Sequence, residues 1–418
     1  MTTSEFILQH RLSNPRDLAL QARRYPDVDM PYALNQIQGW QTARQKLPSW
    51  ASCDGVVYPP HLNMEQCSSE PTARYKQEVA LRWLNKLGVG QGGATTSMAD
   101  LTGGFGVDFS FTSRCFASAT YVERNSSLCD VVSGNLPRLG ISNANVVCAE
   151  AEDSLATMPQ QTMLFLDPAR RDEHGAKTVL IADCTPNVCR LLPQLMSKAR
   201  FVMLKLSPML DWHKAIADLK GTVDEVHIVS VGGECKELLL VLAGKVSVSS
   251  VDSGSLENGV RVYCVDIMPK ADADGEYKRS EFCYTIGGLA KNISIPTPHN
   301  STYLFEPNAS IMKAGCFAEL SQAYGIEAIG PNSHLFVSSG RIELFPGRKF
   351  AIEAVCTLNK RQLKQTLGTL KQANIAVRNF PMSVAELRKR LKLRDGGDTY
   401  IFATTTMEGE HVLIICRK

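Results

Sequence analysis

Met98-Ala-Asp-Leu-Thr-Gly-Gly-Phe-Gly-Val-Asp108 is the most informative segment of this chain. It predicts a short strand over 97–101 that ends in a glycine-rich turn and opens onto a helix. Glycines at a strand end let backbone N–H groups approach a ligand closely, because no Cβ stands in the way. Such a turn at the carboxyl edge of a parallel sheet is typical of a cofactor pocket in an α/β protein.

The acidic residue in this stretch bears on the kind of cofactor. Dinucleotide-binding proteins need G-x-G-x-x-G, so that a helix N-terminus meets the pyrophosphate, and the stretch lacks that pattern. Asp100 at the strand tip would repel a phosphate but attract the ammonium group of S-adenosylmethionine. The stretch therefore favours a methyl donor over NAD.

Strand and helix signals alternate after residue 97, which predicts a doubly wound, Rossmann-like α/β sheet. Gly232-Gly-Glu-Cys-Lys236 is too short for a crossover helix, so the last two strands should form an antiparallel pair at one edge. Seven strands with one antiparallel is the sheet expected of class I methyltransferases. The predicted strands are 97–101, 119–123, 145–149, 162–167, 200–206, 224–231 and 237–243.

Length and composition limit the class of protein. The 418 residues suggest roughly two to three domains, and the net charge of +3 is too small to indicate a nucleic-acid partner without a local basic patch. The thirteen cysteines never form C-x-x-C, so we expect reduced thiols and no metal site. Neither a signal peptide nor a run of ~20 apolar residues is evident, which predicts a cytoplasmic protein without a membrane span. The oligomeric state is left open.

The periodicity also predicts an organisation in four parts. A helical N-terminal region covers 1–70, and the α/β domain covers 71–260. A connecting segment over 261–345 mixes strands with a helix, and a small α+β domain covers 346–418.

Charged residues follow the ends of successive predicted strands. Glu123 ends the second strand, where a carboxylate can accept hydrogen bonds from both ribose hydroxyls of an adenosine. After the third strand, Glu150 is the first choice for contact with the adenine amino group and Asp153 the second. Each residue alone could be a turn or a solvated strand end, so their order carries the inference. The predicted cofactor-binding residues are Asp100, Thr102, Gly103, Gly104, Gly106, Glu123, Arg124 and Glu150.

Eight segments form a collinear series: 65–70 together with 72–73 and 75–76, 100–108, 121–125, 166–172, 205–208, 231–237, 306–313 and 347–348. Through this series the chain resembles a bacterial family of class I S-adenosylmethionine-dependent methyltransferases with a C-terminal THUMP-like domain. The resemblance implies a methyltransferase fold, a small ferredoxin-like segment around 265–315 and a THUMP-like domain at 346–418. It also implies RNA as the substrate, because THUMP domains are RNA-binding modules.

Leu166-Asp-Pro-Ala-Arg-Arg-Asp172 stands where methyltransferases place the residues that face the methyl group and its acceptor. Ala169 and Arg170 depart from the D/N-P-P-Y/F/W pattern, so methylation of an exocyclic base amine is not indicated. Asp167 is the best candidate for orienting the acceptor or receiving its proton. The predicted catalytic residues are Asp167, Pro168, Arg170 and Lys205.

Alternatives remain open for several of these residues. Arg170 and Arg171 could clamp an acceptor phosphate or form ion pairs within the chain. Lys205 could contact the acceptor or simply pair with Asp167. Cys184, on a predicted helix start, is better explained as a structural thiol than as a nucleophile.

Two predicted helices of the last domain, 358–372 and 383–393, present many basic residues and one acid, Glu386. Such faces suit an RNA backbone, although a merely solvated surface is the common alternative. The leading hypothesis is an RNA methyltransferase acting on tRNA or rRNA; a protein or small-molecule acceptor, or an RNA-binding protein with a vestigial pocket, are the rivals. The predicted substrate-binding residues are Arg171, Lys360, Lys364, Lys371, Arg388, Arg390 and Arg394.

Overall fold

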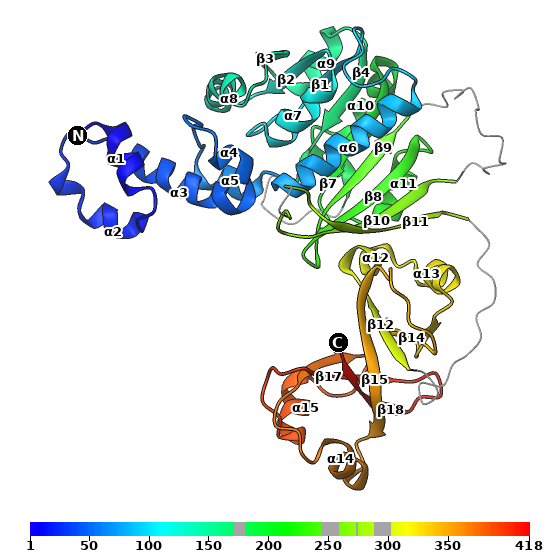
Figure 1. The fold of residues 1–418 in the computed structure, drawn as a ribbon. Helices are drawn as coiled ribbons and strands as arrows, with labels where there is room; N and C mark the ends of the chain where they lie inside the picture. Colours follow the sequence, from blue (N-terminus) through cyan, green and yellow to red (C-terminus); the bar gives the residue numbers. More distant parts are fainter. Residues whose placement is uncertain (171–179, 244–258, 273–274, 288–301) are drawn as a thin grey trace. The chain divides into compact units, whose positions relative to one another are not determined.

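The computed structural model describes residues 1–170, 180–243, 259–272, 275–287 and 302–418. They form two compact units (Figure 1). The first unit comprises Met1–Val226 and Lys236–Val260, and the second comprises His227–Cys235 and Arg261–Lys418.

A helical N-terminal region precedes the sheet of the first unit. Four of its helices carry a proline in the first turn, where the missing N–H has no helical partner to lose. The prolines therefore start helices here. The helices are α1 (Thr3–His10), α2 (Pro15–Leu20), η1 (Ala22–Arg24), α3 (Met30–Lys46), α4 (Pro48–Ala51), α5 (His61–Gln66) and α6 (Glu70–Lys86).

All seven predicted strands of the α/β domain are present. Strands β1, β2, β3, β4 and β7 run parallel, and β9 is antiparallel to β7. These seven strands lie in the order β3-β2-β1-β4-β7-β9-β8. The strands are β1 (Ser97–Asp100), β2 (Ser118–Glu123), β3 (Ala144–Cys148), β4 (Gln161–Leu166), β7 (Ala199–Leu206), β8 (Val223–Val231) and β9 (Glu234–Leu242).

The predicted count of seven strands and one antiparallel strand is not confirmed, because the sheet has nine strands. Beyond β8 it continues with β10 (Arg261–Ile267) and β11 (Arg279–Thr285), which are antiparallel to each other. The β8–β9 pair is therefore not at the edge. The outer strand β11 is largely polar, so its sequence lacks the apolar run of a buried strand.

Helix α6 packs on β7 and β8. Trp83 stacks on Phe201 of β7, with ring centroids 5.5 Å apart, and its indole N–H donates to Glu225 of β8 at 2.9 Å. Figure 1 shows α6 crossing these strands. The other elements of this unit are α7 (Val107–Thr112), η2 (Ser113–Cys115), α8 (Ser126–Arg138), α9 (Ala151–Thr157), β5 (Ala169–Arg170), η3 (Ile181–Asp183), β6 (Cys184–Thr185), α10 (Val188–Lys198) and α11 (Trp212–Asp218).

The second unit contains a seven-stranded sheet in the order β13-β14-β12-β15-β18-β17-β16. Leucines of α14 and α15, among them Leu363 and Leu387, cover one face of it, packed with Ile401 and Leu413. Helix α15 begins with a capping box, in which Ser383 Oγ accepts the Glu386 N–H and the Glu386 carboxylate accepts the Ser383 N–H. The elements are β12 (Tyr303–Pro307), α12 (Ala309–Ala314), α13 (Phe317–Tyr324), β13 (Glu327–Ala328), β14 (Phe336–Ser338), β15 (Gly347–Thr357), α14 (Lys360–Leu367), β16 (Asn374–Arg378), α15 (Val384–Leu391), β17 (Thr399–Thr405) and β18 (His411–Arg417).

A buried asparagine joins the N-terminal region to the α/β sheet. Asn135 of α8 is 1% exposed; its Oδ1 accepts from the Val57 N–H at 2.9 Å, and its Nδ2 donates to the Val57 carbonyl at 2.8 Å. Asn135→Ala should lower the free energy of unfolding by about 1–3 kcal/mol, because both backbone groups lose their partner. Denaturant unfolding followed by tryptophan fluorescence measures this, since all four tryptophans lie in the first unit.

The matched control is Asn145→Ala, which removes an exposed asparagine of β3 and should change the free energy by less than about 0.5 kcal/mol. Equal losses in the two variants would contradict the proposed role of Asn135.

Candidate functional site

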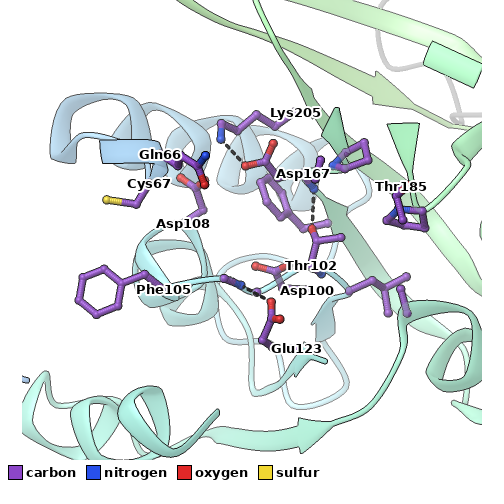
Figure 2. A pocket seen from close by; sticks show the side chains of 18 of the residues that line it. Gln66, Cys67, Asp100, Thr102, Phe105, Asp108, Glu123, Asp167, Thr185 and Lys205 are labelled. Atoms are coloured by element: carbon purple, nitrogen blue, oxygen red, sulfur yellow. Dashed lines mark hydrogen bonds and ion pairs between the residues drawn. The ribbon is translucent and has the colours of Figure 1, made fainter. Parts of the chain in front are cut away.

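The carboxyl ends of β1, β2, β4 and β7 surround a cavity of about 590 Å³ in the first unit. All eight predicted cofactor-binding residues line it, as do Asp167, Pro168 and Lys205 (Figure 2). Asp153, the second choice for the adenine contact, is not among the lining residues. The side chain of Arg170 lies outside the described part of the chain. Arg171 lies outside the described residues. The structure thus brings most of the predicted residues to one cleft.

Each glycine of the loop after β1 stands where the backbone angle or a neighbouring side chain disfavours any other residue. A Cβ on Gly103 would lie 2.1 Å from the Tyr121 ring, so no side chain fits there. Gly104 and Gly106 have φ of +54° and +77°, in the left-handed region that favours glycine. The Tyr121 hydroxyl also donates a hydrogen bond to the Gly104 carbonyl. The loop is therefore held tightly against β2.

Glu123, at the end of β2, holds the same loop from its other side. Its Oε2 accepts the Gly104 N–H at 2.9 Å, and its Oε1 accepts the Asn125 N–H at 2.9 Å. A carboxylate oxygen can accept more than one hydrogen bond, so both oxygens remain able to accept from a ligand hydroxyl. Glu123 is placed both to shape the loop and to face the cavity (Figure 2).

Asp100 is a carboxylate buried at the wall of the cavity. It is 1% exposed, and its Oδ1 accepts the Thr102 N–H at 3.0 Å. Burial raises the pKa of Asp100 well above its ordinary value, and the nearby carboxylates of Asp108 and Asp167 raise it further. A cation bound beside Asp100 would relieve this unfavourable burial of charge.

Asp167 and Lys205 form an ion pair at the tips of β4 and β7 (Figure 2). The parallel register pairs Leu166 with Leu204, which brings the two following residues together. The Asp167 N–H donates to Thr102 Oγ1 at 2.6 Å, which fixes this strand tip to the glycine loop. Of the two roles that the sequence left open for Lys205, the structure thus contains the pairing with Asp167.

The charge state of Lys205 follows from its surroundings. Burial alone would lower the pKa of Lys205, but the carboxylates of Asp167, Asp108 and Glu237 together raise it above its ordinary value. The ammonium group is therefore protonated at neutral pH and cannot act as a general base.

A buried charge cluster below the cavity was missed in the sequence. The Lys76 ammonium group, fully buried in α6, lies 2.5 and 2.6 Å from the two oxygens of Glu237 and 3.1 Å from Asp108 Oδ1. Ser68 donates to the other oxygen of Asp108 at 2.7 Å. Lys76, Glu237, Asp108 and Ser68 all lie in the segments through which the chain resembles the methyltransferase family. That resemblance was the signal from which the cluster could have been found. The cluster holds Asp108 at the cavity wall.

The N-terminal region supplies another wall of the cavity. Asn63, Gln66 and Cys67 line it, although the sequence analysis assigned no role to residues 1–70. The Lys46 ammonium group donates to the carbonyls of Met64 and Glu65, at 2.8 and 2.6 Å, and so anchors this segment. Burial raises the pKa of Cys67, so its sulfur is a thiol and not a thiolate nucleophile at neutral pH.

The described part of the chain contains no group of three or more His, Cys, Asp and Glu side chains that could hold a metal ion. None of its helices combines the length and the apolar character that crossing a membrane requires.

The basic residues predicted to bind RNA lie on or beside α14 and α15 of the second unit. Arg388 differs from the rest, because it is half-buried and donates to Asp395 at 2.7 Å and to the Ala373 carbonyl at 3.2 Å. The exposed ones are Lys360, Lys364, Lys371, Arg390 and Arg394.

Two family models match the second unit. A THUMP domain-like model matches residues 347–418, and a ferredoxin-like domain model matches residues 303–346. The ferredoxin-like match therefore lies further along the chain than the implied range of 265–315. None of the curated proteins matches the sequence.

Solved structures give the comparison over the whole chain. A candidate methyltransferase from Porphyromonas gingivalis W83 is 29% identical, with a TM-score of 0.81, over 100% of this chain and 97% of that one. An rRNA methylase from Streptococcus thermophilus is 12% identical (TM-score 0.31; 41% of this chain, 96% of that one). An S-adenosylmethionine-dependent methyltransferase from Agrobacterium tumefaciens is 16% identical (TM-score 0.29; 41% and 62%). The family resemblance is confirmed: the chain has a methyltransferase fold and carries a THUMP-like domain at residues 347–418.

Proposed function

We propose that the chain is an S-adenosylmethionine-dependent methyltransferase that acts on RNA. The observation that carries this proposal is that the glycine loop, Glu123 and Asp167 line one cavity at the carboxyl edge of a parallel sheet. The methyltransferase fold supports the chemistry, and the THUMP-like domain supports the choice of RNA.

The residues at the cavity fit the cofactor. A Cβ on Gly104 would meet only the Thr102 carbonyl oxygen, at 3.8 Å, so the loop leaves open space beside its backbone. Buried Asp100 suits the methionine ammonium group, Glu123 suits the ribose hydroxyls, and Glu150 suits the adenine amino group. This row of carboxylates is unfavourable for the phosphates of a dinucleotide.

The proposed catalysis rests on positioning. The cofactor supplies an electrophilic methyl group, so an acceptor held in line with it needs little further activation. Lys205 and Thr102 fix the Asp167 carboxylate and backbone, and the protonated Lys205 leaves Asp167 as the group that accepts a hydrogen bond or proton from the acceptor. Asn63 and Gln66 also line the cavity and would contact the acceptor with their amides.

Delivery of RNA is assigned to the second unit. The exposed lysines and arginines on and beside α14 and α15 form a basic surface that suits a phosphate backbone. The choice of RNA as the acceptor is tested by mass spectrometry of tRNA and rRNA nucleosides from cells with and without the protein. One methylated nucleoside should disappear in its absence and return with the wild-type chain but not with Asp167→Asn. Unchanged RNA would favour a protein or small-molecule acceptor.

Glu123→Ala should weaken S-adenosylhomocysteine binding by about 10- to 100-fold, because the charge-assisted hydrogen bonds to the ribose are lost. Isothermal titration calorimetry measures the affinity. Asp153→Ala is the matched control, since this exposed carboxylate of α9 does not line the cavity. Thermal unfolding of both variants shows separately whether loss of the Glu123 hydrogen bond to the Gly104 N–H destabilises the fold. Unchanged affinity in Glu123→Ala would show that the ribose assignment is wrong, and no binding to the wild type would point to a vestigial pocket.

Asp100→Asn should remove the pH dependence of S-adenosylhomocysteine binding. The raised pKa of Asp100 means that its carboxyl is neutral above the ordinary value of 3.8, whereas the ligand ammonium group favours the ionised form. Wild-type affinity should therefore rise with pH, with proton release, and level off above the raised pKa. Calorimetry in two buffers of different ionisation enthalpy, at a series of pH values above the ordinary 3.8, measures the released protons. A pH-dependent variant, or a pH-independent wild type, would contradict the assignment.

A further inference from the structure

A second cavity, of about 1230 Å³, lies in the second unit along β12 and β15. It has no part in the proposed methyl-transfer site. Among the described residues, seven basic side chains line it, against two acidic ones, Asp266 and Glu306. Four of the basic side chains pair with carboxylates that do not line the cavity, Lys278 with Asp272, Arg279 with Glu281, and Arg341 and Lys349 with Glu343. The positive charge beyond these pairs lies at Arg348, Arg378 and Lys418. The basic residues are Lys278, Arg279, Arg341, Arg348, Lys349, Arg378 and Lys418.

Arg348 and Arg378 differ from the other basic residues because the carboxylate that they share is buried. The Glu306 side chain is 7% exposed; its Oε2 accepts from Arg348 Nε at 2.6 Å, and its Oε1 accepts from Arg378 Nη2 at 2.9 Å. The two arginine side chains remain 49% and 40% exposed. The buried Glu306 carboxylate thus holds two guanidinium groups that line the cavity.

This arrangement is fixed by the strands. The antiparallel register of β12 and β15 places Glu306 directly opposite Arg348. A Cβ on Gly347 would lie 2.2 Å from the Glu306 carbonyl oxygen, so only glycine permits this close approach. The Arg348 guanidinium also lies over the Phe350 ring, 5.4 Å from its centroid. Little side-chain entropy remains to be lost when a ligand binds.

The charge of the three side chains is not balanced. Two guanidinium groups and one carboxylate leave a net charge of +1, and the two cations repel each other. The histidine next to them reflects this field: burial lowers the pKa of His334, and the charge of Arg378 lowers it further. An anion that bridges both arginines would relieve the repulsion.

We propose that this cavity binds a phosphate group, carried by an RNA strand or by a free nucleotide, on Arg348 and Arg378. Guanidinium groups match the oxygens of a phosphate in a forked geometry, and the Arg348 N–H groups not directed at Glu306 have no acceptor among the described residues. Tyr303, a half-buried aromatic residue that lines the same cavity, could pack its ring against the nucleoside attached to the phosphate. The site lies entirely in the second unit and takes no part in methyl transfer. As a site for RNA it rests on the proposed function, which assigns RNA delivery to this unit; as a site for a free nucleotide it does not.

The test is a titration of the full-length chain at constant ionic strength with inorganic phosphate, uridine 5′-monophosphate and a uridine oligonucleotide. Uridine probes and excess S-adenosylhomocysteine keep the adenosine site of the first unit out of the measurement. Arg348→Gln should weaken binding about tenfold or more. Arg417→Gln is the matched control: Arg417 pairs with Glu353 at 2.8 Å on the same sheet but does not line the cavity, so binding should not change.

The arms of the titration distinguish the sources of the phosphate. If the oligonucleotide binds much more tightly than the monophosphate and Arg348→Gln removes the difference, the site is assigned to RNA; equal binding that Arg348→Gln weakens assigns it to a free nucleotide. Binding of none of the three probes, or binding unaffected by Arg348→Gln, overturns the proposal. Arg348→Lys, which keeps the charge but loses the fork, serves if the glutamine variant unfolds, and should bind more weakly than the wild type. Absence of S-adenosylhomocysteine binding in the same samples would count against the proposed methyl transfer and leave the phosphate result intact.

Discussion

The parallel pairing of β1 with β2 and β4 is the constraint on which the candidate site depends. The register sets Asp100 beside Tyr121 on one side and Phe165 on the other, so three strands end at the same edge. Residues that follow those ends must meet, whatever their separation in the sequence. The cavity is therefore a consequence of strand register, and its side chains are the ones that the chain places just beyond each strand.

The buried cluster of Lys76, Glu237 and Asp108 gives this edge its rigidity. Removing one member of a buried ion pair leaves an uncompensated charge, so the cluster is costly to disturb and ties α6, α7 and β9 together. Burial raises the pKa of Glu237, although Lys76 opposes the shift. In the second unit a related arrangement, a buried Glu306 with two arginines, has its cations partly exposed. We interpret the first cluster as structural and the second as a binding site, because only the second presents free N–H groups to a cavity.

The sequence predicted the elements whose apolar runs are continuous and the polar residues that follow them. Glu123 and Asp167 could be located because each comes directly after such a strand. Strand β11 could not be located, because it is mostly polar. Its partner β10 lies in a segment that the sequence assigned to a separate part of the chain. The pairing of Lys76 with Glu237 spans 161 residues, and no local pattern indicates which distant carboxylate a buried lysine will meet. The four-part division of the chain and the roles of the site residues stay predictions.

A crystal structure of the chain with S-adenosylhomocysteine bound tests the central claim most directly. The account predicts that the ligand occupies the cavity at the carboxyl edge of the sheet, with ribose hydroxyls on Glu123, its ammonium group beside Asp100 and its sulfur facing Asp167. A ligand bound elsewhere, or one in this cavity whose ribose and ammonium group contact neither carboxylate, would contradict it.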